Sequence, residues 1–138
     1  MSLILTRTEI EKLEQIISEQ LLSSGAEHVV VTDLSGNLIM ERGTVEMEDI
    51  FSLAAVSAAN FAATAEIARL IGEEDFALLY HKGGKRNVHF SRLAKDYLII
   101  TLFSDNVSLG LIRLRIGNAI NEMTAIFAQH KGAVPWRS

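Results

Sequence analysis

The spacing of apolar residues predicts a helix near the start of the chain. An apolar side chain recurs there every three or four positions, at Ile10, Leu13, Ile17 and Leu21. This spacing gives the helix one apolar face, which needs a sheet or another helix to cover it. Thr6 or Thr8 can cap the helix, since each has a glutamate three residues later, and the Ser-Ser-Gly of residues 23–25 ends it.

A β-hairpin is predicted next. Residues 28–32 are mostly β-branched, and residues 38–40 are apolar. Between them, residues 33–37 read Asp-Leu-Ser-Gly-Asn and supply turn formers. Two apolar runs joined by such a turn are typical of paired antiparallel strands.

Three further strands are predicted in the second half of the chain, over residues 76–80, 88–90 and 97–103. Gly83 and Gly84 turn the chain between the first two of them. The third is an unbroken apolar run, as expected for a central strand that is buried on both faces. We therefore predict a three-stranded meander.

Residues 47–71 predict a long helix that ends at Gly72 and is rich in alanine. Its alanines are Ala54, Ala55, Ala58, Ala59, Ala62, Ala63, Ala65 and Ala68. Most of them share one flank, whereas larger residues such as Leu53, Val56 and Ile67 lie around the other. A helix with two apolar flanks needs cover on more than one side, so we expect a second copy of the chain to cover it. The alternative is that alanine is present as the best helix former and the helix packs only within its own chain.

A last helix, capped by Asp105 or Ser108, completes the predicted order of elements. Its inner positions are Ile112, Ile116, Ile120, Met123 and Phe127. The order is α-β-β-α-β-β-β-α, which we interpret as an α/β fold of the α+β sandwich type, with a five-stranded, mainly antiparallel sheet and helices on both faces. We expect one domain over residues 1–132 and a short C-terminal tail over residues 133–138.

Composition and charge argue against several kinds of binding partner and site. Of 138 residues, 49% are apolar and 22% charged, and the net charge is −4, so nucleic-acid binding is not expected. The absence of cysteine excludes disulfides and thiolate metal sites and fits the expected cytoplasmic location. Residues 1–7 lack the pattern of a signal peptide. The most apolar stretch, residues 50–65, is interrupted by polar residues and falls short of the about 20 residues that span a bilayer, so we expect no membrane insertion.

No motif in the sequence predicts catalysis, a cofactor or a metal. The segment 81–86, His-Lys-Gly-Gly-Lys-Arg, lacks the Ser or Thr and the helix that follow a phosphate-binding loop, so we interpret it as a hairpin turn. Its three basic residues form an exposed positive tip that suits an acidic partner. The histidines lack zinc-site spacing and are expected on the surface, and the acids at 73–75 are expected to be solvated.

Three segments together resemble the Roadblock family, which is named after a dynein light chain, and within it the bacterial MglB-like branch. They are the strand-turn-strand of residues 29–38, the alanine-filled helix over 53–70, and the run from residue 97 through 113 into the last helix. The resemblance covers nearly the whole chain. It implies a homodimer in which the central helices of two subunits pack together and the strands at 76–80 join two sheets. The interface residues that we predict are Phe51, Ala55, Ala58, Ala62, Phe76, Leu78 and Tyr80.

The resemblance also implies a function. Members of the bacterial branch look like activators of small Ras-like GTPases that reposition the catalytic groups of the GTPase itself, and no arginine of this sequence stands out as an inserted finger. We expect such a GTPase as partner, bound by Asn60, Thr64 and Arg69, and no enzymatic activity of the chain's own. The alternative is a non-catalytic scaffold or adaptor in a signalling or motility assembly. A third interpretation, a small-ligand sensor, lacks convergent polar groups in the sequence.

Overall fold

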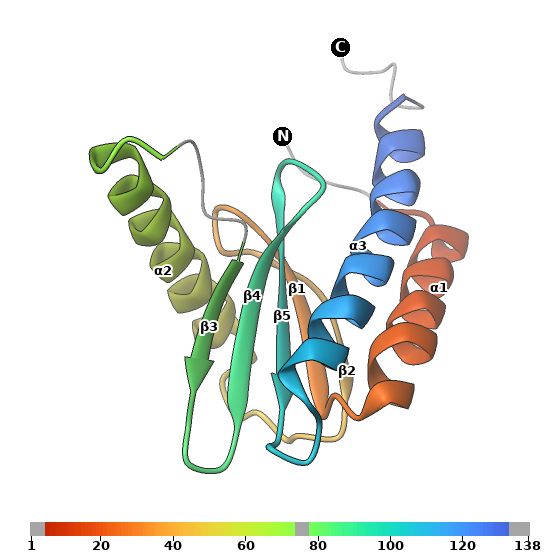
Figure 1. The fold of residues 1–138 in the computed structure, drawn as a ribbon. Helices are drawn as coiled ribbons and strands as arrows, with labels where there is room; N and C mark the ends of the chain where they lie inside the picture. The colour runs from red at the N-terminus through yellow and green to blue at the C-terminus, as the bar shows by residue number, and fades with distance from the viewer. Residues whose placement is uncertain (1–4, 74–77, 133–138) are drawn as a thin grey trace.

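The computed structural model describes residues 5–73 and 78–132, which form three helices and a five-stranded sheet (Figure 1). The helices are α1 (Arg7–Ile16), α2 (Ile50–Leu70) and α3 (Leu109–Gly132). The strands are β1 (His28–Asp33), β2 (Leu38–Gly43), β3 (Leu78–Lys82), β4 (Asn87–Leu93) and β5 (Tyr97–Phe103). The predicted order of elements is confirmed.

The order of the described strands in the sheet is β2-β1-β5-β4-β3, and each neighbouring pair is antiparallel. β5 lies at the centre, as its unbroken apolar run predicts. Helices α1 and α3 cover one face and α2 lies against the other (Figure 1). The predicted sandwich with helices on both faces is therefore confirmed.

Alternate residues of the same strands pack into two separate cores. Val29 and Val31 of β1 lie in the core under α1 and α3, whereas Val30 between them faces α2. The period of two along a strand produces this division. The core under α2 is the smaller one, and its buried members are Val30, Phe61, Phe90, Leu98 and Ile100.

Side-chain caps fix where the helices begin. Thr6, not Thr8, caps α1: the Glu9 N–H donates to Thr6 Oγ1 at 3.1 Å, and the Thr6 N–H donates to Glu9 Oε1 at 2.8 Å. After Ile16 the helix widens into a π-helical stretch over Ile17–Leu21 and then tightens into a 3-10 turn over Leu22–Ser24. It ends at Gly25, whose φ of 107° is a left-handed conformation that favours glycine. Of the two candidates for α3, Ser108 is the cap, since its Oγ accepts from the Leu111 N–H at 3.1 Å.

Two predicted boundaries need correction. The middle helix begins at Ile50 and not at residue 47, because Asp49 accepts a hydrogen bond from the Ser52 N–H at 3.0 Å and caps it there. The strand predicted over 76–80 ends two residues later than expected, since its described part is Leu78–Lys82. Phe76 and the side chain of Leu78 lie outside the described part of the chain, as does the predicted tail at 133–138.

Candidate interaction surface

One face of α2 is apolar and exposed. Phe51 is 71% exposed, Val56 66%, Ile67 53% and Leu70 68%. Among the described residues, eight large apolar side chains are exposed, and five of them lie between Phe51 and Ile71. Such a concentration on a single helix is typical of surfaces that bind another protein.

The other face of α2 packs on the sheet. Its buried residues are Ala54, Ser57, Ala58, Phe61 and Ala68. They recur at three- and four-residue steps, so a single stripe of the helix is covered. The chain therefore covers only part of a helix that is apolar nearly all round.

The turn between β1 and β2 explains part of the alanine flank. Asp33 shapes this turn by accepting from the Ser35 N–H at 3.0 Å and the Asn37 N–H at 2.9 Å. A β-carbon on Gly36 would lie 2.9 Å from the Cα of Ala55 and 3.6 Å from the Cβ of Ala58. Small residues on α2 thus let the turn approach the helix closely.

This contact corrects the prediction for Ala58. It is 4% exposed in a single chain and has almost no surface left for a second copy. Sequence periodicity placed it correctly on the alanine flank but could not show that the flank is occupied by the chain's own turn. Phe51, Ala55 and Ala62 are exposed, and their assignment to an interface stays a prediction.

Tyr80 lies on the edge strand β3, but its ring points into the molecule. It is partly buried and stacks on Phe103 with ring centroids 6.1 Å apart, on the α3 side of the sheet. Any contribution of Tyr80 to pairing with a second copy would therefore come from its backbone. Among the described residues, β3 pairs only with β4, so its outer edge is open.

The three predicted partner-binding residues do not form one patch. Asn60 and Thr64 lie on one flank of α2, where the Thr64 hydroxyl donates to the Asn60 carbonyl at 3.0 Å. Arg69 lies about 140° or more around the helix from both. Its Nε donates to Glu66 Oε1 at 3.0 Å, and this hydrogen bond lowers the pKa of Glu66 and keeps it ionised.

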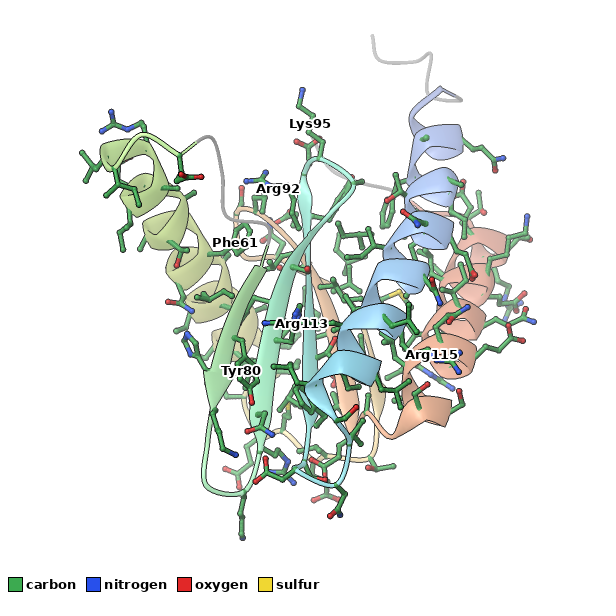
Figure 2. The ribbon with its side chains drawn as sticks, in the orientation of Figure 1. Phe61, Tyr80, Arg92, Lys95, Arg113 and Arg115 are labelled. Atoms are coloured by element: carbon green, nitrogen blue, oxygen red, sulfur yellow. The ribbon has the colours of Figure 1, made fainter. Side chains whose placement is uncertain are left out.

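A hollow of about 450 Å³ opens beside the Arg69 flank. Its lining residues are Leu34, Ala58, Phe61, Ala62, Ala65, Glu66, Arg69 and Arg92. The Arg92 guanidinium lies 5.4 Å from the centre of the Phe61 ring and donates to the Lys95 carbonyl at 3.1 Å. Figure 2 shows Phe61 on α2 close to Arg92 on β4. Sequence reasoning missed this pairing of Arg92 with α2, because nothing in the spacing of the two elements signals it.

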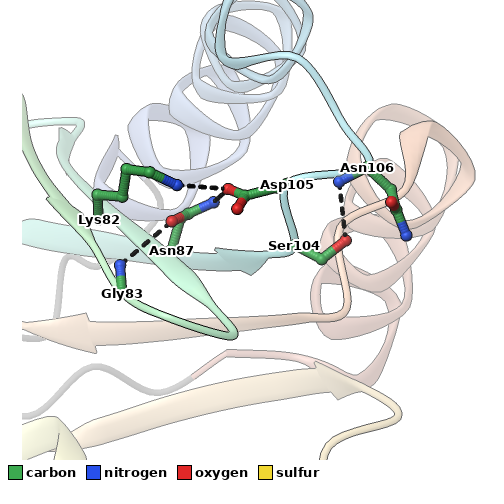
Figure 3. A network of polar contacts seen from close by, with 6 residues as sticks. All are labelled: Lys82, Gly83, Asn87, Ser104, Asp105 and Asn106. Atoms are coloured by element: carbon green, nitrogen blue, oxygen red, sulfur yellow. Dashed lines mark hydrogen bonds and ion pairs between the residues drawn. The ribbon is translucent and has the colours of Figure 1, made fainter.

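The basic tip is already paired with the chain's own acids. Lys82 Nζ lies 2.8 Å from Asp105 Oδ1, and Arg86 Nε lies 2.9 Å from Glu27 Oε1 (Figure 3 shows the first pair). Two of its three cations are therefore compensated, and the case for an acidic partner at this tip is weakened. The interpretation as a hairpin turn is confirmed, since the segment joins β3 to β4.

Two histidines are buried, which corrects the prediction that they lie on the surface. His28 is 4% exposed: its Nε2 lies 2.7 Å from Glu41 Oε1, and its Nδ1 accepts from the Val45 N–H at 3.2 Å. His89 is 1% exposed, and burial, with a smaller contribution from Arg113, lowers its pKa from 6.5 to about 4. Within residues 5–73 and 78–132, no group of three or more His, Asp or Glu residues is arranged to hold a metal ion.

The apolar part of helix α2 extends beyond residues 50–65, the stretch on which the expectation about membranes rests. The helix has 21 residues and a mean hydropathy of 1.4 over its most apolar window, so by length and composition alone it passes the test for a membrane span. The expectation that this helix is too short to span a bilayer is therefore wrong. The stripe that packs on the sheet instead makes α2 a part of the folded domain, and the absence of membrane insertion stays a prediction.

Comparison with known proteins agrees with this architecture. The Roadblock/LC7 domain matches residues 12–104. MglB of Myxococcus xanthus has a similar structure, with a TM-score of 0.85 and 32% identity over 93% of this chain and 96% of that one.

Two further proteins are similar to this chain at lower identity. The gliding protein MglB of Thermus thermophilus also reaches a TM-score of 0.85, at 24% identity over 93% of this chain and 97% of that one. An uncharacterized protein of Aquifex aeolicus is 23% identical over 124 residues, which are 88% of this chain and 76% of that protein. The domain match and the identity to M. xanthus MglB show that this chain belongs to the Roadblock/LC7 domain family.

Proposed function

We propose that this chain is a homodimeric, cytoplasmic regulator of a small Ras-like GTPase. The observation that carries the proposal is the exposed apolar face of α2, where Phe51, Val56 and Leu70 are each more than 60% exposed. Apolar surface of this extent favours binding to another protein. The fold shared with MglB at 32% identity supports the choice of a GTPase as partner.

Self-association is proposed through β3 and α2 together. The open edge of β3 has backbone groups available to another strand. A two-fold axis that joins two β3 edges also brings two α2 helices together on the same face of the extended sheet. Val56 and Ile67 lie on the flank of α2 away from the β1–β2 turn, so we assign them to the contact between the helices. This arrangement replaces the dimer contact that the sequence predicts for Phe51 and Ala62: we propose that they, with the hollow beside Arg69, bind the GTPase.

In this proposal the chain accelerates hydrolysis without a catalytic group of its own. Phosphoryl transfer depends mainly on positioning and on electrostatic stabilisation. A surface that holds the switch segments of the GTPase in the reactive arrangement supplies the positioning. Arg69 is engaged with Glu66, and this arrangement does not favour its use as an inserted finger.

The test is GTP hydrolysis by a small Ras-like GTPase from the same genome, measured as phosphate release with and without the purified chain. We expect faster release, and we expect Phe51→Ser to remove most of the effect. Leu114→Ser is the matched control, because Leu114 is 61% exposed on α3, on the other side of the sheet. If hydrolysis is unchanged by the parent chain at saturating concentration, the regulator proposal fails.

A scaffold is the second candidate function, and the apolar character of the α2 face favours it. Such a face can bind proteins without offering groups that act on a nucleotide. Isothermal titration separates the two functions. A GTPase that binds the chain with unchanged hydrolysis and exchange rates indicates a scaffold.

A further inference from the structure

The end of the edge strand β3 is held by a polar network that the sequence did not reveal. Asp105 Oδ1 accepts from Lys82 Nζ and from Asn87 Nδ2, each at 2.8 Å. Asn87 Oδ1 in turn accepts from the Gly83 N–H at 3.2 Å. Figure 3 shows Lys82 and Asn87 converging on Asp105, and the Gly83 N–H contacting Asn87.

The network joins three parts of the fold. Lys82 is the last residue of β3 and pairs in register with Asn87, the first residue of β4. Asn87 is 2% exposed and pairs on its other side with Phe103, at the end of the central strand β5. Asp105 follows two residues later, in the loop that leads to α3. The network therefore ties the end of the edge strand β3 to the end of the central strand β5.

The turn that the network closes is tight. A β-carbon on Gly83 would lie 2.2 Å from the Arg86 carbonyl oxygen, so the turn needs glycine there. On its far side, Arg86 is bound to Glu27, just before β1. The hairpin of β3 and β4 is therefore held at its tip from both the β5 and the β1 side.

The Lys82–Asp105 contact contributes little to stability itself. The two side chains are 60% and 61% exposed. Ion pairs that are this exposed to solvent contribute little to the free energy of unfolding. The contact instead restricts where the end of β3 lies. This position matters because another strand can pair with β3 only if the backbone N–H and C=O groups of its outer edge are correctly placed.

We propose that Asp105 is a positioning residue for self-association: by holding Lys82 and Asn87, it fixes the end of the edge strand that joins the second copy. This inference rests on the proposed homodimer through β3. Without Asp105 the hairpin tip moves relative to β5, and part of the binding free energy is used to order it again.

The experiment compares the parent chain with Asp105→Ala and with Glu14→Ala as a matched control. Glu14, on α1, forms another surface ion pair: its Oε2 lies 3.9 Å from Nη1 of Arg42, which is on β2 at the opposite edge of the sheet. Sedimentation equilibrium gives the dissociation constant of the dimer, and hydrogen exchange gives the protection of the β3 amides. We expect Asp105→Ala to raise the dissociation constant about fivefold and to speed exchange in β3 but not in β1 or β2. Glu14→Ala is expected to change neither.

Two further variants separate positioning from loss of structure. Asp105→Asn keeps an acceptor for Asn87 but removes the charge that binds Lys82. It replaces Asp105→Ala in the experiment if Asp105→Ala does not fold. The double variant Lys82→Asp, Asp105→Lys restores the pair in reversed polarity and should recover part of the affinity of the parent.

The possible results discriminate between this inference and the proposed function. A parent dimer whose dissociation constant and β3 exchange are unaffected by Asp105→Ala overturns the positioning role alone. A parent chain that is monomeric at every concentration overturns the proposed homodimer and this inference with it.

Discussion

Replacing His89 by leucine removes a buried titratable group from the sheet beneath α3. His89 is 1% exposed, and it lies directly opposite Thr101 on β5 and Tyr80 on β3. Within the described part of the chain, neither ring nitrogen has a hydrogen-bond partner, and the same holds for the Thr101 hydroxyl. Protonation would place a positive charge in this apolar setting, near Arg113. Figure 2 marks Arg113 on α3 beside the sheet.

The pKa of His89 sets the size and the sign of the effect. Burial, and then Arg113, lower it from 6.5 in the unfolded chain to about 4 in the folded one. Between these values the unfolded chain binds a proton and the folded chain does not, so the free energy of unfolding falls as the pH falls from 6.5 towards 4. The difference of about 2.5 between the two pKa values, at about 1.36 kcal/mol each, corresponds to a loss of roughly 3 kcal/mol at the acid end.

His89→Leu should remove this dependence on pH. Urea unfolding followed by far-UV circular dichroism, at constant protein concentration and at pH 7.5, 6.5, 5.5 and 4.5, measures it. We expect the parent to lose about 2 to 3 kcal/mol more than the variant over this range. At pH 7.5 we expect the variant to be about 1–2 kcal/mol more stable, because an unsatisfied buried polar group is replaced by an apolar one.

The comparison with the variant cancels other acid effects. Hydrogen bonds lower the pKa values of Asp49, Glu66 and Asp105, and these carboxylates lose their contribution as the pH falls through their folded values in both proteins. A difference in stability between parent and variant that stays constant from pH 7.5 to 4.5 would refute the reasoning, because it would mean that His89 has the same pKa in the folded and unfolded chains.

Three further substitutions test the β1–β2 turn, the cap of α1 and the proposed dimer contact of α2. Gly36→Ala, at a φ of 95° and with its new β-carbon 2.9 Å from the Cα of Ala55, should lower the free energy of unfolding by about 1–3 kcal/mol in urea titrations, and a neutral effect would show that the turn does not rest on α2. Thr6→Ala removes the cap shared with Glu9 and should lower stability by about 1 kcal/mol in the same assay, whereas Thr8→Ala should not. Ile67→Glu should give a monomer in light scattering, while Leu114→Glu keeps the oligomeric state of the parent; a dimeric Ile67→Glu would remove that flank from the interface.

Local patterns predicted the elements because each leaves a short-range signal. The spacing of Leu13, Ile17 and Leu21 places them in one core, and these three residues are fully buried. The alternation along β1 sends Val30 to one face and its neighbours to the other. The capping box at Thr6 and Glu9 is a signal only three residues long.

The surface was harder to predict because its contacts join distant parts of the chain. Ala58 is covered by a turn about twenty residues earlier, which no periodicity of the helix encodes. Arg92 meets Phe61 across two elements, and the cations of the hairpin tip find Asp105 and Glu27. His89 could have been placed inside from the sequence, since it lies in an inner strand, β4, on the face that α3 covers, but its polar type favoured the surface.

The two cores differ greatly in size. Among the described residues, sixteen buried apolar residues form the core under α1 and α3, but only five form the core under α2. Most of the apolar burial that drives folding thus lies on the side away from the proposed partner. Helix α2 is consequently the layer that a bound protein can tilt or shift at the smallest cost to the rest of the domain.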